Sequence, residues 1–183
     1  MNKEVDEKLD IYKITKSEEL LKYYQDWTIK DKYNRVMIDL NYVAPKETVS
    51  VLKKYGYSNI DGVDFSQDML NLIPKGVYKS LDKIDLNKPL KFENNKYDIV
   101  ICVGTLTYGH VKAHALNEFK RIIKNKGLIC FTINEGIYEK YGFDKKIKEL
   151  NDNKSWEIKE FFKSNYIVNK GVNAWFCLAE ING

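Results

Sequence analysis

Two places where an expected strand ends in the sequence could carry chemistry. Asp64 ends the short segment 59–64, and the small-residue segment 104–110, which contains Tyr108 and His110, follows the run 97–103, which is apolar except for Asp98. Ligands of open α/β sheets bind at the carboxyl ends of the strands, where a carboxylate can accept two hydrogen bonds from a ribose diol. The simpler interpretation is that Asp64 only turns or caps the chain before a helix.

Tyr108 and His110 are the candidates for proton chemistry, because either side chain can accept or orient the proton of a reacting group. His110 and His114 also have the i, i+4 spacing of zinc-binding helices. Val111, however, stands where such a motif has its glutamate, and two histidines without further ligands make a poor site. We therefore expect no metal, and we interpret both histidines as helix surface or pocket wall.

The elements that position these residues alternate between strand and helix. The expected strands are 59–64, a weak one at 77–81, 97–103 and 128–133, and the expected helices begin at Gln67 and span 112–124. The run 97–103 is apolar except for Asp98, as is typical of a parallel strand buried on both faces. Alternation of this kind predicts an α/β fold with a mostly parallel sheet and right-handed crossovers.

The ends of the chain differ from this middle part. Residues 1–16 are polar and non-periodic and predict a loose arm, after which Ser17 begins a helix that carries Trp27 on its apolar face. Trp27 either covers the core or forms part of a lid over a ligand. A helix is also expected at 46–55 and a polar helical stretch from 134 to about 151. The segments 156–168 and 173–181 predict a terminal antiparallel strand pair.

Composition narrows the function classes. The 183 residues are most simply one domain, 1–183, and the net charge of +4 is scattered along the chain without the basic and aromatic cluster of a nucleic-acid platform. No apolar run approaches a membrane span and the N-terminus is charged, so we expect a cytoplasmic protein. Cys102, Cys130 and Cys177 each lie in an apolar strand-like run, which favours reduced thiols over disulfides.

Several short segments combine in one order along the chain. They are 62–66 (Gly-Val-Asp-Phe-Ser) followed by Met69-Leu70, then Tyr97-Asp98, then 103–106 (Val-Gly-Thr-Leu), then 124–128 (Lys-Asn-Lys-Gly-Leu). In combination they resemble the class I S-adenosylmethionine-dependent methyltransferases. Finer details are Tyr24, Trp27, 41–45 (Asn-Tyr-Val-Ala-Pro), 75–78 (Lys-Gly-Val-Tyr) and 103–111. These resemble the methyltransferase-like family whose human member is encoded in the Williams–Beuren syndrome chromosome region.

This resemblance implies a Rossmann-like three-layer sandwich with a seven-stranded sheet, and S-adenosylmethionine as the cofactor. Asp64 would then hold the ribose hydroxyls, Phe65 and Met69 would flank the adenine, and Tyr108 and His110 would face the methyl acceptor together with Thr107. The implied cofactor-binding residues are Asp64, Phe65, Ser66, Met69, Asp85, Leu86, Gly104, Thr105 and Tyr42. The acceptor itself, a small molecule or a protein, is not identified by the sequence.

One feature of the family is missing. Such enzymes carry a Gly-x-Gly-x-Gly loop after the first strand, where glycine lets the backbone approach the cofactor, yet the first glycine of this chain is Gly56. Either the first strand and its loop are deleted, or 36–40 replaces the strand and 41–46 replaces the loop. The second account is feasible because the stretch 41–58 is long enough for a crossover, which needs about a dozen residues.

Three functions follow from these observations. The first is an S-adenosylmethionine-dependent methyltransferase, and the second is a non-catalytic binding or regulatory protein that keeps the fold while its cofactor loop is lost. The third is a dinucleotide oxidoreductase, which is weaker because no Gly-x-Gly-x-x-Gly turn follows a strand.

Overall fold

The computed structural model describes residues 14, 16–28, 32, 35, 54, 56–167 and 171–183. The chain divides into two compact units, Met1–Asp85 and Leu86–Gly183. The described residues leave out most of the predicted arm 1–16 and most of the predicted helix 46–55. They also leave out the segment 36–40 and Tyr42.

Helix α2 of the first unit, Ser17–Thr28, forms where the apolar spacing predicts it. Leu20 and Trp27 are buried, and the ring of Trp27 packs 4.9 Å from that of Tyr23 between centroids. Burial of one apolar stripe on a short helix supplies more stability than its intrinsic propensity does. Trp27 is therefore part of the packing of this unit.

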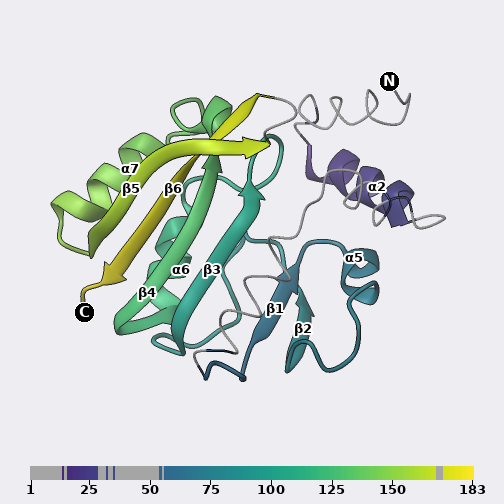
Figure 1. Ribbon diagram of the computed structural model, residues 1–183, viewed down its shortest axis with the longest axis horizontal. Helices are drawn as coiled ribbons and strands as arrows, with labels where there is room; N and C mark the ends of the chain where they lie inside the picture. The colour runs from purple at the N-terminus through teal and green to yellow at the C-terminus, as the bar shows by residue number, and fades with distance from the viewer. Residues whose placement is uncertain are drawn as a thin grey trace. The chain divides into compact units, whose positions relative to one another are not determined.

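The first unit also holds a parallel strand pair, β1 (Asp61–Asp64) and β2 (Ser80–Lys83), joined through the short helix α5 (Gln67–Asn71) (Figure 1). The strand predicted at 77–81 begins later in the structure, at Ser80, and ends at Lys83. The side chain of Tyr78 covers Gly62, where an added β-carbon would lie 3.0 Å from the Tyr78 ring. The ladder begins where the Lys79 N–H donates to the Ile60 carbonyl at 2.7 Å.

The second unit is a four-stranded mixed sheet in the order β3-β4-β6-β5, shown from one face in Figure 1. Its strands are β3 (Tyr97–Leu106), β4 (Ile123–Asn134), β5 (Trp156–Ile167) and β6 (Val172–Ile181). Strands β3 and β4 are parallel, whereas β6 is antiparallel to both β4 and β5. The terminal antiparallel pair is confirmed, and the expected parallel strands pair as β1 with β2 and β3 with β4. The described residues form two sheets of two and four strands and not the single seven-stranded sheet that the resemblance implies. The chain has a Rossmann-like α/β fold.

Several boundaries in this unit differ from the predictions. Strand β3 continues past residue 103 to Leu106, and β4 begins at Ile123 instead of 128. The helix predicted at 112–124 is shortened to α6, Ala115–Ile122, because 112–114 form a turn in which the Ala115 N–H bonds the Lys112 carbonyl. The helical stretch after Asn134 splits into η3 (Glu135–Ile137) and α7 (Phe143–Asp152) at Gly142, whose φ is +74°.

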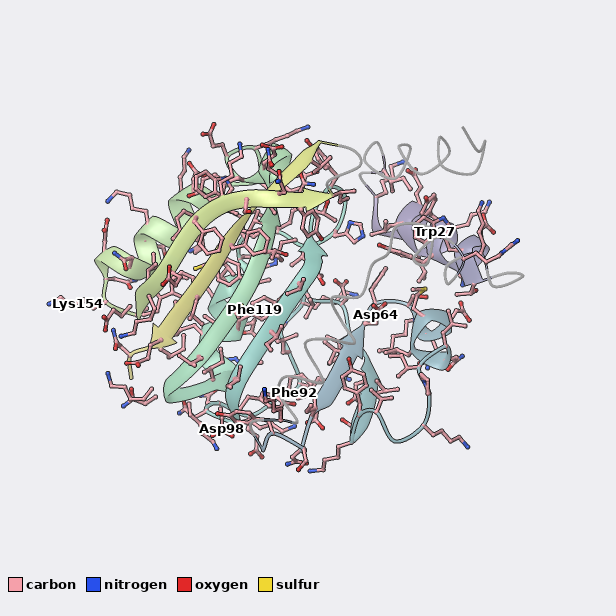
Figure 2. The ribbon with its side chains drawn as sticks, in the orientation of Figure 1. Trp27, Asp64, Phe92, Asp98, Phe119 and Lys154 are labelled. Carbon is pink, nitrogen blue, oxygen red and sulfur yellow. The ribbon has the colours of Figure 1, made fainter. Side chains whose placement is uncertain are left out.

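The core of the second unit lies between the sheet and its helices. Helix α6 packs against β4, and its residue Phe119, labelled in Figure 2, is buried. On the sheet, the buried rings of Phe131 and Trp156 stack with centroids 6.0 Å apart. Among the described residues no helix is long and apolar enough to cross a membrane.

The three cysteines lie on strands and form no disulfide. Cys102 and Cys177 are buried, and Cys130 is half-buried. Desolvation raises the pKa of the Cys102 and Cys177 thiols to about 12. Cys102 and Cys177 are thus inert core thiols in the native state, and all three cysteines are free, as the sequence predicts.

Arg121 fastens the loop before β3 to helix α6. Every nitrogen of its guanidinium donates a hydrogen bond. Nε and Nη2 donate to the Glu118 carboxylate at 3.0 and 2.8 Å. Nη2 also donates to the Leu90 carbonyl, and Nη1 donates to the Phe92 carbonyl and to Asn94 Oδ1. The Arg121 and Glu118 side chains are only 29% and 23% exposed. This bidentate pair raises the pKa of Arg121 and lowers that of Glu118, so both groups stay charged.

Candidate functional site

Asp64 is the last residue of β1 and lies at its carboxyl end, as predicted (Figure 2). Its Oδ1 accepts the Ser66 N–H at 2.7 Å, which turns the chain into α5. Burial of the carboxyl raises its pKa, while hydrogen bonds from the Ser66 and Phe65 backbones act in the opposite direction. The residue still faces solvent. Because a carboxylate offers about four acceptor positions, Asp64 can hold this turn and also accept bonds from a ligand.

Asp85 lies at the same edge of the first unit as Asp64. Strands β1 and β2 are parallel and end in register, with Asp64 opposite Lys83. The Ile84 N–H then donates to the Asp64 carbonyl at 2.8 Å, and Asp85 follows directly, half-buried. The topology therefore brings two of the predicted cofactor-binding carboxylates to one sheet edge. Leu86, also half-buried, begins the second unit.

Ser66 is fully buried and caps helix α5, because its hydroxyl oxygen accepts the Met69 N–H at 3.4 Å. Ser66 is thus the N-cap residue of this helix. Phe65 and Met69 flank this cap and are both half-buried. They present partly accessible apolar surface beside Asp64, whereas the Ser66 side chain serves the turn.

Gly104 interrupts the regular ladder of β3. Its φ is +80°, a conformation that is strained for any residue with a side chain, and its N–H donates to the hydroxyl of Thr132 at 3.1 Å. The pairing of β3 with β4 is correspondingly irregular between Cys102 and Leu106. Thr105, half-buried, hydrogen-bonds the Cys102 thiol. The predicted loop at Gly104 is thus a bulge within a longer strand.

His110 is held by the backbone of its own loop. Its Nδ1 lies 2.5 Å from the Tyr108 carbonyl, and since a carbonyl can only accept, Nδ1 carries the hydrogen. Burial lowers the pKa of His110, and the bond to Tyr108 raises it by a smaller amount. The neutral ring is therefore favoured, with its lone pair on Nε2.

Asn87 joins three parts of this region and was not predicted. Its amide Nδ2 donates to the His110 carbonyl at 3.0 Å, and its Oδ1 accepts the Lys112 N–H at 2.9 Å. The Asn87 carbonyl lies 3.0 Å from Nε2 of His114, which stands immediately before α6. The His114 ring therefore helps to hold the loop that contains Asn87 against the start of α6. Among the described residues, no group of three or more side chains could hold a metal ion. No local signal in the sequence marks Asn87, because its partners lie more than 20 residues away.

Tyr108 lies over Gly136, the middle residue of η3. A β-carbon added to Gly136 would come 1.8 Å from the Tyr108 hydroxyl oxygen, so the ring occupies the space that a side chain would need. Tyr108 also contacts the ring of Tyr141 edge-on, at 6.4 Å between centroids. The Tyr141 hydroxyl in turn accepts the Gly109 N–H at 3.4 Å, and Lys112 Nζ lies 3.7 Å from the Tyr141 ring centroid. The loop after β3 is thus packed against the segment after β4.

Residues 45–131 of the chain match a family model described as a methyltransferase domain. The match contains Asp64, Asp85 and the Gly104 bulge, and it covers a little under half of the chain. No curated protein is similar in sequence at a significant level.

Solved structures of methyltransferases have the same fold. A chain from the complex between the Haloferax volcanii Trm112 methyltransferase activator and a methyltransferase superposes with a TM-score of 0.63 at 14% identity, covering 89% of this chain and 97% of that chain. An S-adenosylmethionine-dependent methyltransferase of Listeria monocytogenes gives 0.56 at 12% identity, covering 72% and 84%. The N-methyltransferase NodS of Bradyrhizobium japonicum, solved with S-adenosyl-L-homocysteine, gives 0.51 at 10% identity, covering 68% and 67%. The chain is therefore methyltransferase-like in fold.

Proposed function

We propose that this protein binds S-adenosylmethionine and transfers its methyl group to an acceptor. The observation that carries the proposal is the position of Asp64, an accessible carboxylate at the carboxyl end of β1 within the segment that matches a methyltransferase domain. A carboxylate at that position can accept both hydroxyls of a ribose. Asp85 at the same edge supports the proposal, and Phe65 and Met69 supply apolar surface for an adenine.

The remaining cofactor contacts are assigned by resemblance. Gly104 and Thr105 would line the floor of the cofactor pocket, and Leu86 would lie near the adenine, while Tyr42 is outside the described residues. Gly104 suits a close approach to a ligand because it has no side chain and adopts positive φ. Methyl transfer needs the protein chiefly to align the methyl group with the acceptor and to exclude water. We also propose the finer relationship to the family encoded in the Williams–Beuren syndrome chromosome region.

His110 and Tyr108 are the proposed residues on the acceptor side. With Nδ1–H bonded to the Tyr108 carbonyl and its pKa lowered, His110 is a neutral base at physiological pH. We expect His110→Gln to lower turnover while leaving the affinity for the cofactor unchanged. Equal turnover of His110→Gln and wild type would remove this role.

The second candidate function is a non-catalytic protein of the same fold. It is favoured by the sequence before Gly56, which contains no glycine where a Gly-x-Gly-x-Gly loop belongs. Such a protein would bind neither S-adenosylmethionine nor S-adenosylhomocysteine, so affinity for these ligands separates the two candidates.

Calorimetric titration with S-adenosylhomocysteine tests the proposal. Asp64→Asn is the informative variant, because the amide oxygen can still accept the Ser66 N–H and keep the turn, whereas its NH2 group cannot accept a ribose hydroxyl. Asp61→Asn is the matched control at the opposite end of the same strand, where Asp61 accepts the Ser80 hydroxyl at 2.9 Å. We expect micromolar binding by wild type and Asp61→Asn and a loss of tenfold or more, about 1.4 kcal/mol, in Asp64→Asn. Folded wild-type protein that binds no S-adenosylhomocysteine would favour the non-catalytic candidate.

A further inference from the structure

A depression opens in the second unit where the chain leaves β4. It has a volume of about 320 Å³ and is lined by Glu135, Gly136, Tyr138, Glu139, Lys140, Lys163 and Trp175. The segment 135–140 forms one wall, and the paired strands β5 and β6 supply Lys163 and Trp175, which are cross-strand partners. Pockets for small molecules begin at about 300 Å³, so the space suits a molecule of one or two rings.

Aromatic rings form the apolar part of this depression. The rings of Tyr138 and Trp175 lie 4.9 Å apart between centroids and are tilted by 33°. Behind them, Phe161 stacks on Trp175 at 5.0 Å with only 6° between the ring planes. Both lining rings are half-buried, so part of their surface is open to solvent. Fixed and partly exposed rings of this kind favour a planar ligand that can stack on them.

The charged residues around these rings balance one another. Glu135 accepts a hydrogen bond from Lys163 Nζ at 2.5 Å and another from the Asn173 N–H at 2.9 Å, so its charge is already compensated. Glu139 and Lys140 add one charge of each sign to the lining. The depression therefore has no net charge to attract a phosphate or a polyamine, and it favours a ligand without net charge.

Gly136 connects this depression to the loop after β3. It lines the depression, and the Tyr108 hydroxyl lies directly against its α-carbon, at the place a β-carbon would take. Tyr108 precedes His110 in the same loop, and the His110 ring bonds the Tyr108 carbonyl. Gly136 thus belongs both to the lining of the depression and to the contact with the loop proposed to face the methyl acceptor.

We infer that this depression binds the methyl acceptor, and that the acceptor is a small planar aromatic molecule without net charge that carries a hydroxyl or amino group. The inference rests on the proposed methyltransferase function. In the transfer, the acceptor oxygen or nitrogen forms a bond to the methyl carbon, and its proton passes to the neutral imidazole of His110, the proposed base. The bond from that carbon to the sulfonium sulfur breaks, and its electron pair stays on sulfur to leave S-adenosylhomocysteine.

The first test follows the indole N–H of Trp175 by NMR in the wild-type chain without cofactor. The probe is 5-hydroxyindole, with cyclohexanol as a non-planar alcohol and phenyl phosphate as a charged aromatic molecule. Trp175→Phe assigns the signal among the three tryptophans. We expect 5-hydroxyindole to shift the Trp175 signal and leave that of buried Trp156 in place. An unchanged Trp175 signal, or an equal shift with cyclohexanol or phenyl phosphate, would overturn the inference.

The second test compares substitutions on the two faces of the β5–β6 pair. Trp175→Leu should weaken 5-hydroxyindole binding about tenfold through the loss of stacking. Phe162→Leu is the matched control, because Phe162 is 49% exposed and stacks on Phe176, the neighbour of Trp175 on the opposite face of β6. Equal affinities of the two variants would contradict the assignment. If Trp175→Leu does not fold, Tyr138→Leu is used in its place.

These measurements separate this inference from the proposed function. Both titrations use no cofactor, so they report on the depression alone. Binding of S-adenosylhomocysteine without binding of 5-hydroxyindole would overturn the aromatic acceptor and keep the methyltransferase. Binding of 5-hydroxyindole without binding of S-adenosylhomocysteine would support the aromatic site and remove methyl transfer as its purpose.

Discussion

Replacing Gly136 with alanine should force Tyr108 out of its position. The new β-carbon would lie 1.8 Å from the Tyr108 hydroxyl oxygen and 2.7 Å from Cζ, whereas real β-carbons are essentially never closer than 3.0 Å to such atoms. The ring must therefore turn away, and its edge-on contact with Tyr141 at 6.4 Å is lost. Lys140, whose Nζ lies 5.7 Å from the Tyr108 ring centroid, loses that contact as well.

The net cost is the difference between two opposing contributions. An aromatic pair contributes about 0.5–1.5 kcal/mol and an exposed cation–π contact about 0.5–1 kcal/mol. Alanine in place of glycine at a helical position raises the free energy of unfolding by roughly 0.4–1 kcal/mol, because it restricts the unfolded chain. Gly136 does not adopt positive φ, so that gain applies to it. We expect Gly136→Ala to lower the free energy of unfolding by about 1 kcal/mol.

A double-mutant cycle measured by urea denaturation isolates this contact. In a Tyr108→Ala background the clash disappears, so Gly136→Ala should be neutral or slightly stabilising, with a coupling of about 1–2 kcal/mol between the two positions. Far-ultraviolet circular dichroism provides the signal for all four proteins. Equal effects of Gly136→Ala in both backgrounds would show that Tyr108 does not lie over Gly136, and would refute the reasoning.

Three further predictions follow from the second unit. Arg121→Lys should lower the free energy of unfolding by about 2 kcal/mol, because lysine cannot reproduce the guanidinium fork, and urea denaturation would measure the loss. Because burial holds the pKa of His110 below its ordinary value of 6.5, the unfolded chain binds the extra proton, and stability should fall as the pH drops below about 6.5. His110→Gln should have a shallower dependence of the urea midpoint on pH, and an identical slope would contradict this account. Cys102 and Cys177 should resist thiol reagents until the chain unfolds, with half-buried Cys130 reacting first, as mass spectrometry of the labelled protein would show.

The strand positions could be predicted where apolar residues cluster along the chain. The segment 99–103 of β3 is apolar without interruption, and the terminal pair β5 and β6 shows the spacing of antiparallel strands. The strand predicted at 77–81 included Tyr78, whose ring packs over Gly62 outside the β1–β2 ladder. An apolar residue signals burial, but it does not specify whether the backbone joins a ladder.

The candidate site could be predicted in part. Asp64 and the Gly104 region are local features, since each lies where an expected strand ends and glycine marks an unusual backbone conformation. The tether by Asn87 and the contact between Tyr108 and Gly136 join residues 23 or more positions apart. Such contacts depend on tertiary packing, which spacing within one element does not encode. The depression at Trp175 was missed for the same reason.

The most direct test of cofactor binding is the amide NMR signal of Ser66 during titration of the wild-type chain with S-adenosylhomocysteine. The Ser66 N–H donates to the Asp64 carboxylate at 2.7 Å, so ribose hydroxyls that bind this carboxylate must change its resonance. The amide of Asp61, at the other end of β1, is the internal reference. The account predicts a saturable shift at Ser66 and little change at Asp61. An unchanged Ser66 signal at saturating S-adenosylhomocysteine would contradict the claim that Asp64 holds the cofactor.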